Sequence, residues 1–69
     1  MNLSHEQPVQ AVFLEAAVNR NIFGGVDCVT ASFDGWMVYV HDSDDLPACK
    51  VLTWCGLPVK YAVLPGPGR

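Results

Sequence analysis

The chain has 69 residues, of which 51% are hydrophobic and 16% charged, and its formal net charge is −3. A chain of this length forms one small domain, and its acidic balance argues against nucleic-acid binding, which usually needs a basic stripe. No segment approaches the ~18 consecutive apolar residues of a membrane-spanning helix, and the N-terminus lacks the pattern of a signal peptide. We therefore expect a cytoplasmic protein without nucleic-acid or membrane partners.

The first apolar pattern predicts a helix over residues 6–19. Ser4 followed by Gln7 fits a capping box at its start, and the segment from Asn19 to Asn21 ends it. Apolar residues in this stretch recur at the spacing of one helical face, which we expect to be buried. That face consists of Val9, Val12, Phe13, Ala16 and Ala17, and it is widened by Ala11, Leu14 and Val18.

Residues 26–41 are predicted to form a β-hairpin, the element around which the rest of the chain packs. The dipeptide Asp34-Gly35 lies between two runs of strand-forming residues. This dipeptide favours a type I′ turn, because both central residues of such a turn need a positive φ. We therefore expect Asp34 and Gly35 to be the two loop residues of the hairpin.

Side chains alternate between the two faces of a strand, so the hairpin has two faces of different composition. One face is wholly apolar and is expected in the core: Val29, Ala31, Phe33, Trp36, Val38 and Val40. The other face is mixed and is expected to meet solvent or a partner: Cys28, Thr30, Ser32, Met37, Tyr39 and His41.

The second half of the chain predicts a helix and a last strand. Residues 44–55 follow an Asp/Ser segment that can cap a helix, and Gly56 can end it, although the Val, Thr and Trp residues in this stretch also fit a strand. Residues 58–64 alternate like a strand, and the Pro/Gly-rich residues 65–69 are expected to be a flexible tail.

The resulting order is α-β-β-α-β over a single domain of residues 1–64. This order predicts an α+β fold, a two-layer sandwich with a three-stranded sheet and both helices on one face. The crossover through the second helix makes the last strand parallel to the second strand. The mixed sheet face is then uncovered in a monomer.

Cys28 and His41 are the candidates for catalysis. The expected register places them opposite each other, where a histidine can lower the pKa of a thiol and create a nucleophile. The pair also supplies two ligands of the four that a zinc site needs, but no further ligands are evident, so we expect no metal and no cofactor. The alternative is that Cys28 simply packs, because cysteines usually behave as small hydrophobic residues.

The acidic residues Asp42, Asp44 and Asp45 have two interpretations. Carboxylates can bind a hard cation, but this segment lacks the length and the terminal glutamate of an EF-hand loop. Helix capping explains the same residues. An inhibitor that mimics nucleic acid is a further hypothesis for an acidic chain, although only these three residues cluster.

Four residues are candidates for partner binding. Trp54 lies closer to Lys50 than to the apolar face of the expected second helix, and Trp is enriched at binding hot spots; if that segment packs differently, Trp54 belongs to the core. Tyr39, Met37 and Thr30 lie on the mixed face of the hairpin, and Tyr and Met are enriched at protein interfaces.

We conclude that the sequence is most consistent with a small, non-enzymatic protein-interaction module. High apolar content in so small a chain leaves apolar surface for a partner, and a second copy in a homodimer is the commonest one. The alternative is a thiol-dependent enzyme or redox protein that uses Cys28 and His41. The three cysteines, an odd number without a signal peptide, indicate free thiols in a reducing compartment.

Overall fold

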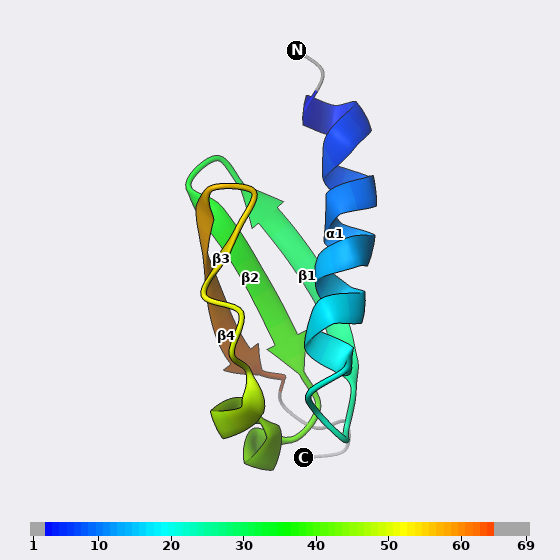
Figure 1. The fold of residues 1–69 in the computed structure, drawn as a ribbon, viewed down its shortest axis with the longest axis vertical. Helices are drawn as coiled ribbons and strands as arrows, with labels where there is room; N and C mark the ends of the chain where they lie inside the picture. Colours follow the sequence, from blue (N-terminus) through cyan, green and yellow to red (C-terminus); the bar gives the residue numbers. More distant parts are fainter. Residues whose placement is uncertain (1–2, 65–69) are drawn as a thin grey trace.

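The computed structural model describes residues 3–64, with side chains from Val9 onward. Its elements are α1 (Leu3–Asn19), β1 (Val26–Ser32), β2 (Gly35–Val40), the 3-10 helix η1 (Ser43–Ala48), β3 (Thr53–Trp54) and β4 (Leu57–Val63), and Figure 1 shows their arrangement. The tail predicted for residues 65–69 and the side chains of the predicted capping box lie outside the described residues.

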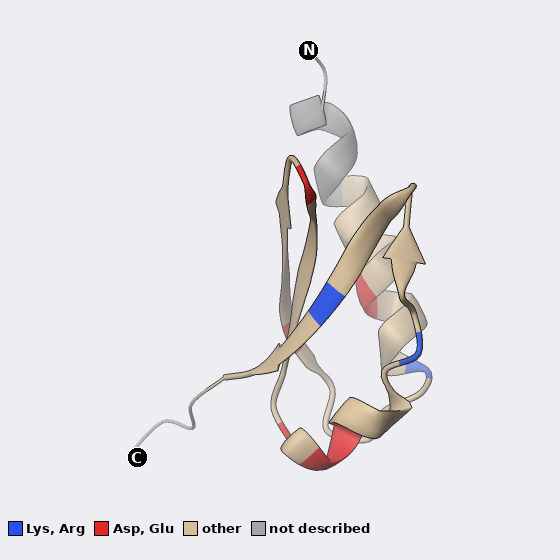
Figure 2. Cartoon of the chain, turned by 90° about the vertical axis from the view of Figure 1, so that its left-hand side faces the viewer, with Lys and Arg blue, Asp and Glu red and all other residues tan. Residues whose placement is uncertain are grey.

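The fold is a small α+β domain with one α-helix and a mixed sheet. The strand order is β1-β2-β4-β3, with β1 antiparallel to β2, β4 parallel to β2, and β3 antiparallel to β4. The parallel pairing of the last strand is therefore confirmed, but the sheet has four strands where three were expected. In Figure 2, α1 lies on one side of the hairpin formed by β1 and β2, and no helix of the described chain lies on the other side.

The core lies between α1 and the sheet. Leu14 and Val18 of α1 are fully buried, and so are Val38 and Val40 of β2. The alternation predicted for β2 is confirmed, because its residues switch regularly between buried and half-buried positions. The core cluster contains Leu14, Val18, Ile22, Val26, Trp36, Val38, Val40 and Val59.

The predicted loop of the hairpin is wrong by one position. Ser32 pairs with Gly35, so the two loop residues are Phe33 and Asp34, and neither has a positive φ. This shift moves each cross-strand partner by two residues, which leaves the two faces of the hairpin unchanged. Only Phe33 changes its environment: it was expected in the core, but it lies in the loop and is 93% exposed.

The type I′ geometry that was expected at Asp34-Gly35 occurs instead between β3 and β4. Trp54 pairs with Leu57, which leaves Cys55 and Gly56 as a two-residue loop. Both residues have positive φ values, 54° and 80°. Positive φ at both central positions is the requirement of this turn.

The prediction of a helix over residues 44–55 is wrong. The segment forms only the short η1 and then becomes extended, and the alternative of a strand is confirmed at Thr53–Trp54. Pro47 lies inside η1, and a proline lacks the N–H that a longer helix would use. One of the three possible capping residues, Asp42, does cap η1, since its side chain accepts a hydrogen bond from the backbone N–H of Asp44.

The end of α1 at Asn19 is confirmed, and its start lies at Leu3 rather than residue 6. The predicted centre of its buried face is wrong. Val12 and Phe13 are 62% and 56% exposed, whereas Leu14 and Val18 face the sheet. Apolar residues occur on both sides of this helix, so periodicity alone could not decide which side is inside. We call the exposed side the outer face of α1; it comprises Val9, Val12, Phe13 and Ala16.

Candidate functional site

The sheet side away from α1 carries the residues predicted to bind a partner. Alternation along β1, β2 and β4 places eight side chains on this side in three rows across the strands. We call it the open face. Its rows are Cys28, Tyr39 and Ala62, then Thr30, Met37 and Lys60, then Ser32 and Pro58, which lie on either side of Gly35.

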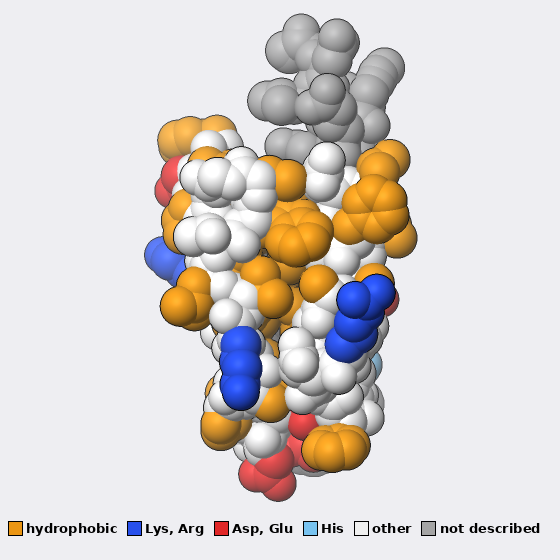
Figure 3. Space-filling model, in the orientation of Figure 1, with side chains coloured by type: hydrophobic (Ala, Val, Ile, Leu, Met, Phe, Trp, Pro, Cys, Tyr) orange, Lys and Arg blue, Asp and Glu red, His pale blue; other side chains and the backbone are white. Residues whose placement is uncertain are grey.

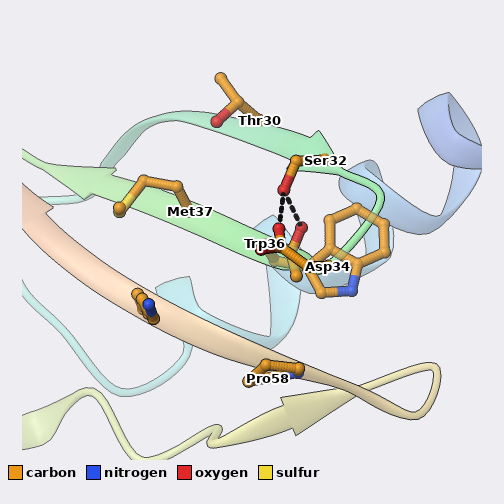
Figure 4. Close-up of a pocket in the computed structure, with 8 residues that line it drawn as sticks. Thr30, Ser32, Asp34, Trp36, Met37 and Pro58 are labelled. Carbon is orange, nitrogen blue, oxygen red and sulfur yellow. Dashed lines mark hydrogen bonds between the residues drawn. The ribbon is translucent and has the colours of Figure 1, made fainter.

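Gly35 creates a hollow in the open face. Each row has a side chain on β2 except the last, where Gly35 leaves an opening between Ser32 and Pro58. A cavity of ≈ 190 Å³ lies at this position, and Figure 4 draws its lining residues, six of them labelled. Glycine is required here by space, because a Cβ at Gly35 would lie 2.9 Å from the backbone oxygen of Pro58.

The cavity has a polar end and an apolar side. The Ser32 hydroxyl donates a hydrogen bond to Oδ1 of Asp34 over 2.7 Å, and both residues belong to the polar end (Figure 4). Met37 and Pro58 supply apolar surface, and Lys60 supplies the single cation of the lining. This combination suits the docking of an amphipathic side chain, which has an apolar body and a polar tip.

Thr30 and Met37 are direct cross-strand partners, and both line the cavity. Tyr39 follows Met37 on the same face of β2, two residues along the strand, and is half-buried. The structure therefore brings together the three residues that the mixed face of the hairpin was predicted to offer.

Cys28 and His41 are not brought together. Cys28 pairs with Tyr39, because the shifted loop moves each cross-strand partner by two residues. His41 lies beyond the end of β2, with Nε2 3.5 Å from Oδ1 of Asp27. Desolvation and then the neighbouring Asp27 raise the pKa of the Cys28 thiol, which opposes formation of a thiolate. The geometric basis of the predicted thiol–imidazole pair is therefore wrong.

Trp54 joins the β3 segment to α1. Its indole Nε1 donates to the backbone oxygen of Gln10 over 3.1 Å, and its own backbone oxygen accepts from Nε1 of Trp36 over 2.9 Å. The side chain is half-buried against the core. This position agrees with the interpretation of Trp54 as part of the core, and its role in binding stays a prediction.

Asp45 has a structural role that sequence reasoning missed. It is only 4% exposed, and its two oxygens accept hydrogen bonds from the backbone N–H groups of Phe23 and Gly24, over 3.1 and 2.7 Å. Its partners lie more than twenty residues away in sequence, so no local pattern indicates this contact. Within the described residues, no three His, Cys, Asp or Glu side chains are grouped as metal ligands.

Comparison of the chain with protein-family models, curated proteins and solved structures found no match. In the described part of the chain, no helix has the length and apolar character needed to cross a membrane.

Proposed function

We propose that this protein is a small, non-enzymatic protein-interaction module that self-associates through the open face of its sheet. The observation that carries the proposal is that two neighbouring strands, β1 and β2, present Thr30, Met37 and Tyr39 on a sheet side that α1 leaves uncovered. Tyr and Met are enriched at the centres of protein interfaces, where they supply contact area. The half-buried state of both residues leaves part of each side chain free for a partner.

The outer face of α1 is the competing surface. Figure 3 shows hydrophobic side chains exposed along α1, on the right of the view. A helix that is apolar on all sides is normally covered. A single convex helix nevertheless offers less contact area than the flat side of a sheet, and area is what a stable interface requires. We therefore place self-association on the open face, and the outer face of α1 becomes the control.

Two other functions have less support. A thiol enzyme would need a base beside Cys28, but His41 lies near Asp27 instead. A nucleic-acid mimic would need free carboxylates, but Asp45 is buried and the Asp42 side chain caps η1. We also propose a cytoplasmic location, which is supported by the three free cysteines, Cys28, Cys49 and Cys55.

Sedimentation equilibrium at micromolar concentrations tests the proposal with a matched pair of variants. Tyr39→Glu places a charge on the open face, and Val12→Glu places the same charge on the outer face of α1. We expect the average mass of the wild type and of Val12→Glu to rise from monomer toward dimer as their concentration increases through and above the micromolar range, and Tyr39→Glu to remain the 7.5 kDa monomer. Dissociation by Val12→Glu alone would move the interface to α1, and a monomeric wild type would contradict self-association.

A further inference from the structure

We infer that two copies dock face to face across a two-fold axis, so that Tyr39 of each copy fills the cavity above Gly35 of the other. This inference rests on the proposed function, since it specifies how the open face meets its partner. A two-fold interface is self-complementary: if one residue contacts a second, the second contacts the first in return. A surface suited to such a contact needs a protrusion and a hollow at equal distances on either side of the two-fold axis. The axis then places the protrusion of each copy opposite the hollow of the other.

The spacing along β2 satisfies this requirement. Gly35, Met37 and Tyr39 occupy successive positions on the open face, and each step of two residues covers roughly 6.7 Å. Met37 is therefore midway between the hollow at Gly35 and the ring of Tyr39. Consider a two-fold axis that lies between the two copies, passes over Met37 and runs perpendicular to the strands. Such an axis reverses the strand direction in the second copy. It therefore places each Tyr39 over the Gly35 of its partner.

The alternative two-fold axis runs along the strands. It would place Tyr39 against Tyr39 and the hollow against the hollow. Two hollows that face each other leave their lining without contact atoms, which forfeits the dispersion energy of a packed interface. The hollow of ≈ 190 Å³ is thus the feature that selects the first arrangement.

The chemistry of the cavity suits a tyrosine. Its apolar side, formed by Met37 and Pro58, can pack against the aromatic ring, and sulfur–aromatic contacts are favourable. Its polar end holds the carboxylate of Asp34 and the hydroxyl of Ser32, both of which can accept a hydrogen bond from the phenol O–H. Buried tyrosines usually find such a partner for their hydroxyl group.

The dimensions of the molecule also favour this mode. A standard interface removes about 800 Å² from each partner, which is a modest part of the 4741 Å² that this chain exposes. The molecule measures 39 × 25 × 17 Å, and the open face is one of its two broad sides. The open face itself covers β1, β2 and β4, which are six or seven residues and so roughly 20 Å long. This smaller area suits an interface at the lower end of the usual range.

The arrangement carries one electrostatic cost. Lys60 lies in the same row as Met37, so the axis over Met37 brings the two copies of Lys60 close together. Like charges at an interface oppose association. We therefore expect Lys60→Gln to tighten the dimer severalfold. Under the alternative axis Lys60 meets Thr30 of the other copy, and the same substitution would have little effect.

A pair of complementary variants tests the inference. Tyr39→Glu carries a negative charge into a cavity that already contains Asp34, and Ser32→Lys places a positive charge beside that cavity. We expect each variant alone to associate at least tenfold more weakly than the wild type. An equimolar mixture should form heterodimers, because the carboxylate introduced at position 39 of one copy meets the ammonium group introduced at position 32 of the other. A two-fold dimer contains this contact twice. In the second one, the native Tyr39 of the Ser32→Lys copy meets the native Ser32 of the Tyr39→Glu copy.

Native mass spectrometry distinguishes the heterodimer from both homodimers by mass, and circular dichroism of each variant verifies the fold. If either variant loses its fold, Tyr39→Asp and Ser32→Arg replace the pair. Single variants that dissociate without recovery in the mixture would overturn the docking mode and leave the open face as the interface. Single variants that remain dimeric would overturn both the docking mode and the proposed function.

Discussion

Asp45 shows how one buried residue connects distant parts of this small domain. Its carboxylate, which lies in η1, holds the backbone of Phe23 and Gly24 in the loop between α1 and β1. A Cβ at Gly24 would lie 2.8 Å from Oδ2 of Asp45, so the loop approaches the carboxylate too closely for a side chain. The contact ties the end of α1 to the segment that follows the hairpin.

We predict that Asp45→Ala lowers the free energy of unfolding by about 2–4 kcal/mol, because it leaves two backbone donors without acceptors in a partly buried site. Asp45→Asn should cost nearly as much, since its amide group can accept only one of the two hydrogen bonds. The control is Asp44→Ala, an exposed neighbour, with a cost of about 0.5 kcal/mol or less. Urea denaturation measures all three, and equal stability of the Asp45 and Asp44 variants would show that the contact contributes nothing.

At the scale of elements, α1 permits a test on adjacent residues. Leu14 is fully buried and Phe13 is 56% exposed. We predict that Leu14→Ala costs about 2–5 kcal/mol, the range for large-to-small substitutions in cores. Phe13→Ala should cost about 1 kcal/mol or less in the monomer, although the sequence pattern alone places Phe13 inside. Thermal or urea unfolding of the two variants decides the orientation of the helix, and a larger loss for Phe13→Ala would reverse it.

The turn between β3 and β4 contains a strained residue. Cys55 has a φ of 54°, a conformation that costs a non-glycine residue roughly 1 kcal/mol and that Asn tolerates better. We predict that Cys55→Asn raises the free energy of unfolding by about 0.5 kcal/mol. The gain is reduced by loss of the contact between the Cys55 thiol and Oε1 of Gln10. Cys55→Val should destabilise the protein, and a stabilising Cys55→Val would contradict the turn geometry.

Elements with a strong local pattern could be predicted from the sequence, and those that depend on distant contacts could not. The end of α1, both strands of the hairpin and the last strand were correct because their periodicity is clear. The segment 44–55 was mistaken for a helix because a capping residue does precede it. The contacts that hold its second half in an extended conformation, such as the hydrogen bond from Trp54 to Gln10, are made with α1, which is distant in sequence. The loop of the hairpin was misplaced because Asp34-Gly35 fits a type I′ turn that the structure forms at Cys55-Gly56 instead.

The same division applies to the candidate site. Alternation correctly placed Thr30, Met37 and Tyr39 on one face, because a shift of two residues preserves the faces of a strand. The cavity could not be predicted, since it arises where Gly35 lies beside Pro58 of β4, more than twenty residues away. The predicted contact of Cys28 with His41 failed because the misplaced loop moved the partner of Cys28 from His41 to Tyr39.

At the scale of the whole molecule, the domain is built with one protected side and one unprotected side. The core cluster lies on the side of the sheet that α1 covers, while the open face carries an aromatic ring, a thioether and a hollow. A domain of this length has a thin margin of stability, and association is a common way to increase it. We therefore expect the stability of the protein to rise with its concentration, as mass action requires when a folded dimer forms.

The most direct test of the central claim is a dilution series followed by ¹H–¹⁵N correlation spectra of the wild type. Amide signals report the contact surface residue by residue, without any substitution. We predict concentration-dependent shifts that cluster at Thr30, Met37, Tyr39 and Lys60, with constant signals from Val12 and Phe13. Shifts confined to α1, or spectra that do not change from micromolar to millimolar concentration, would contradict self-association through the open face.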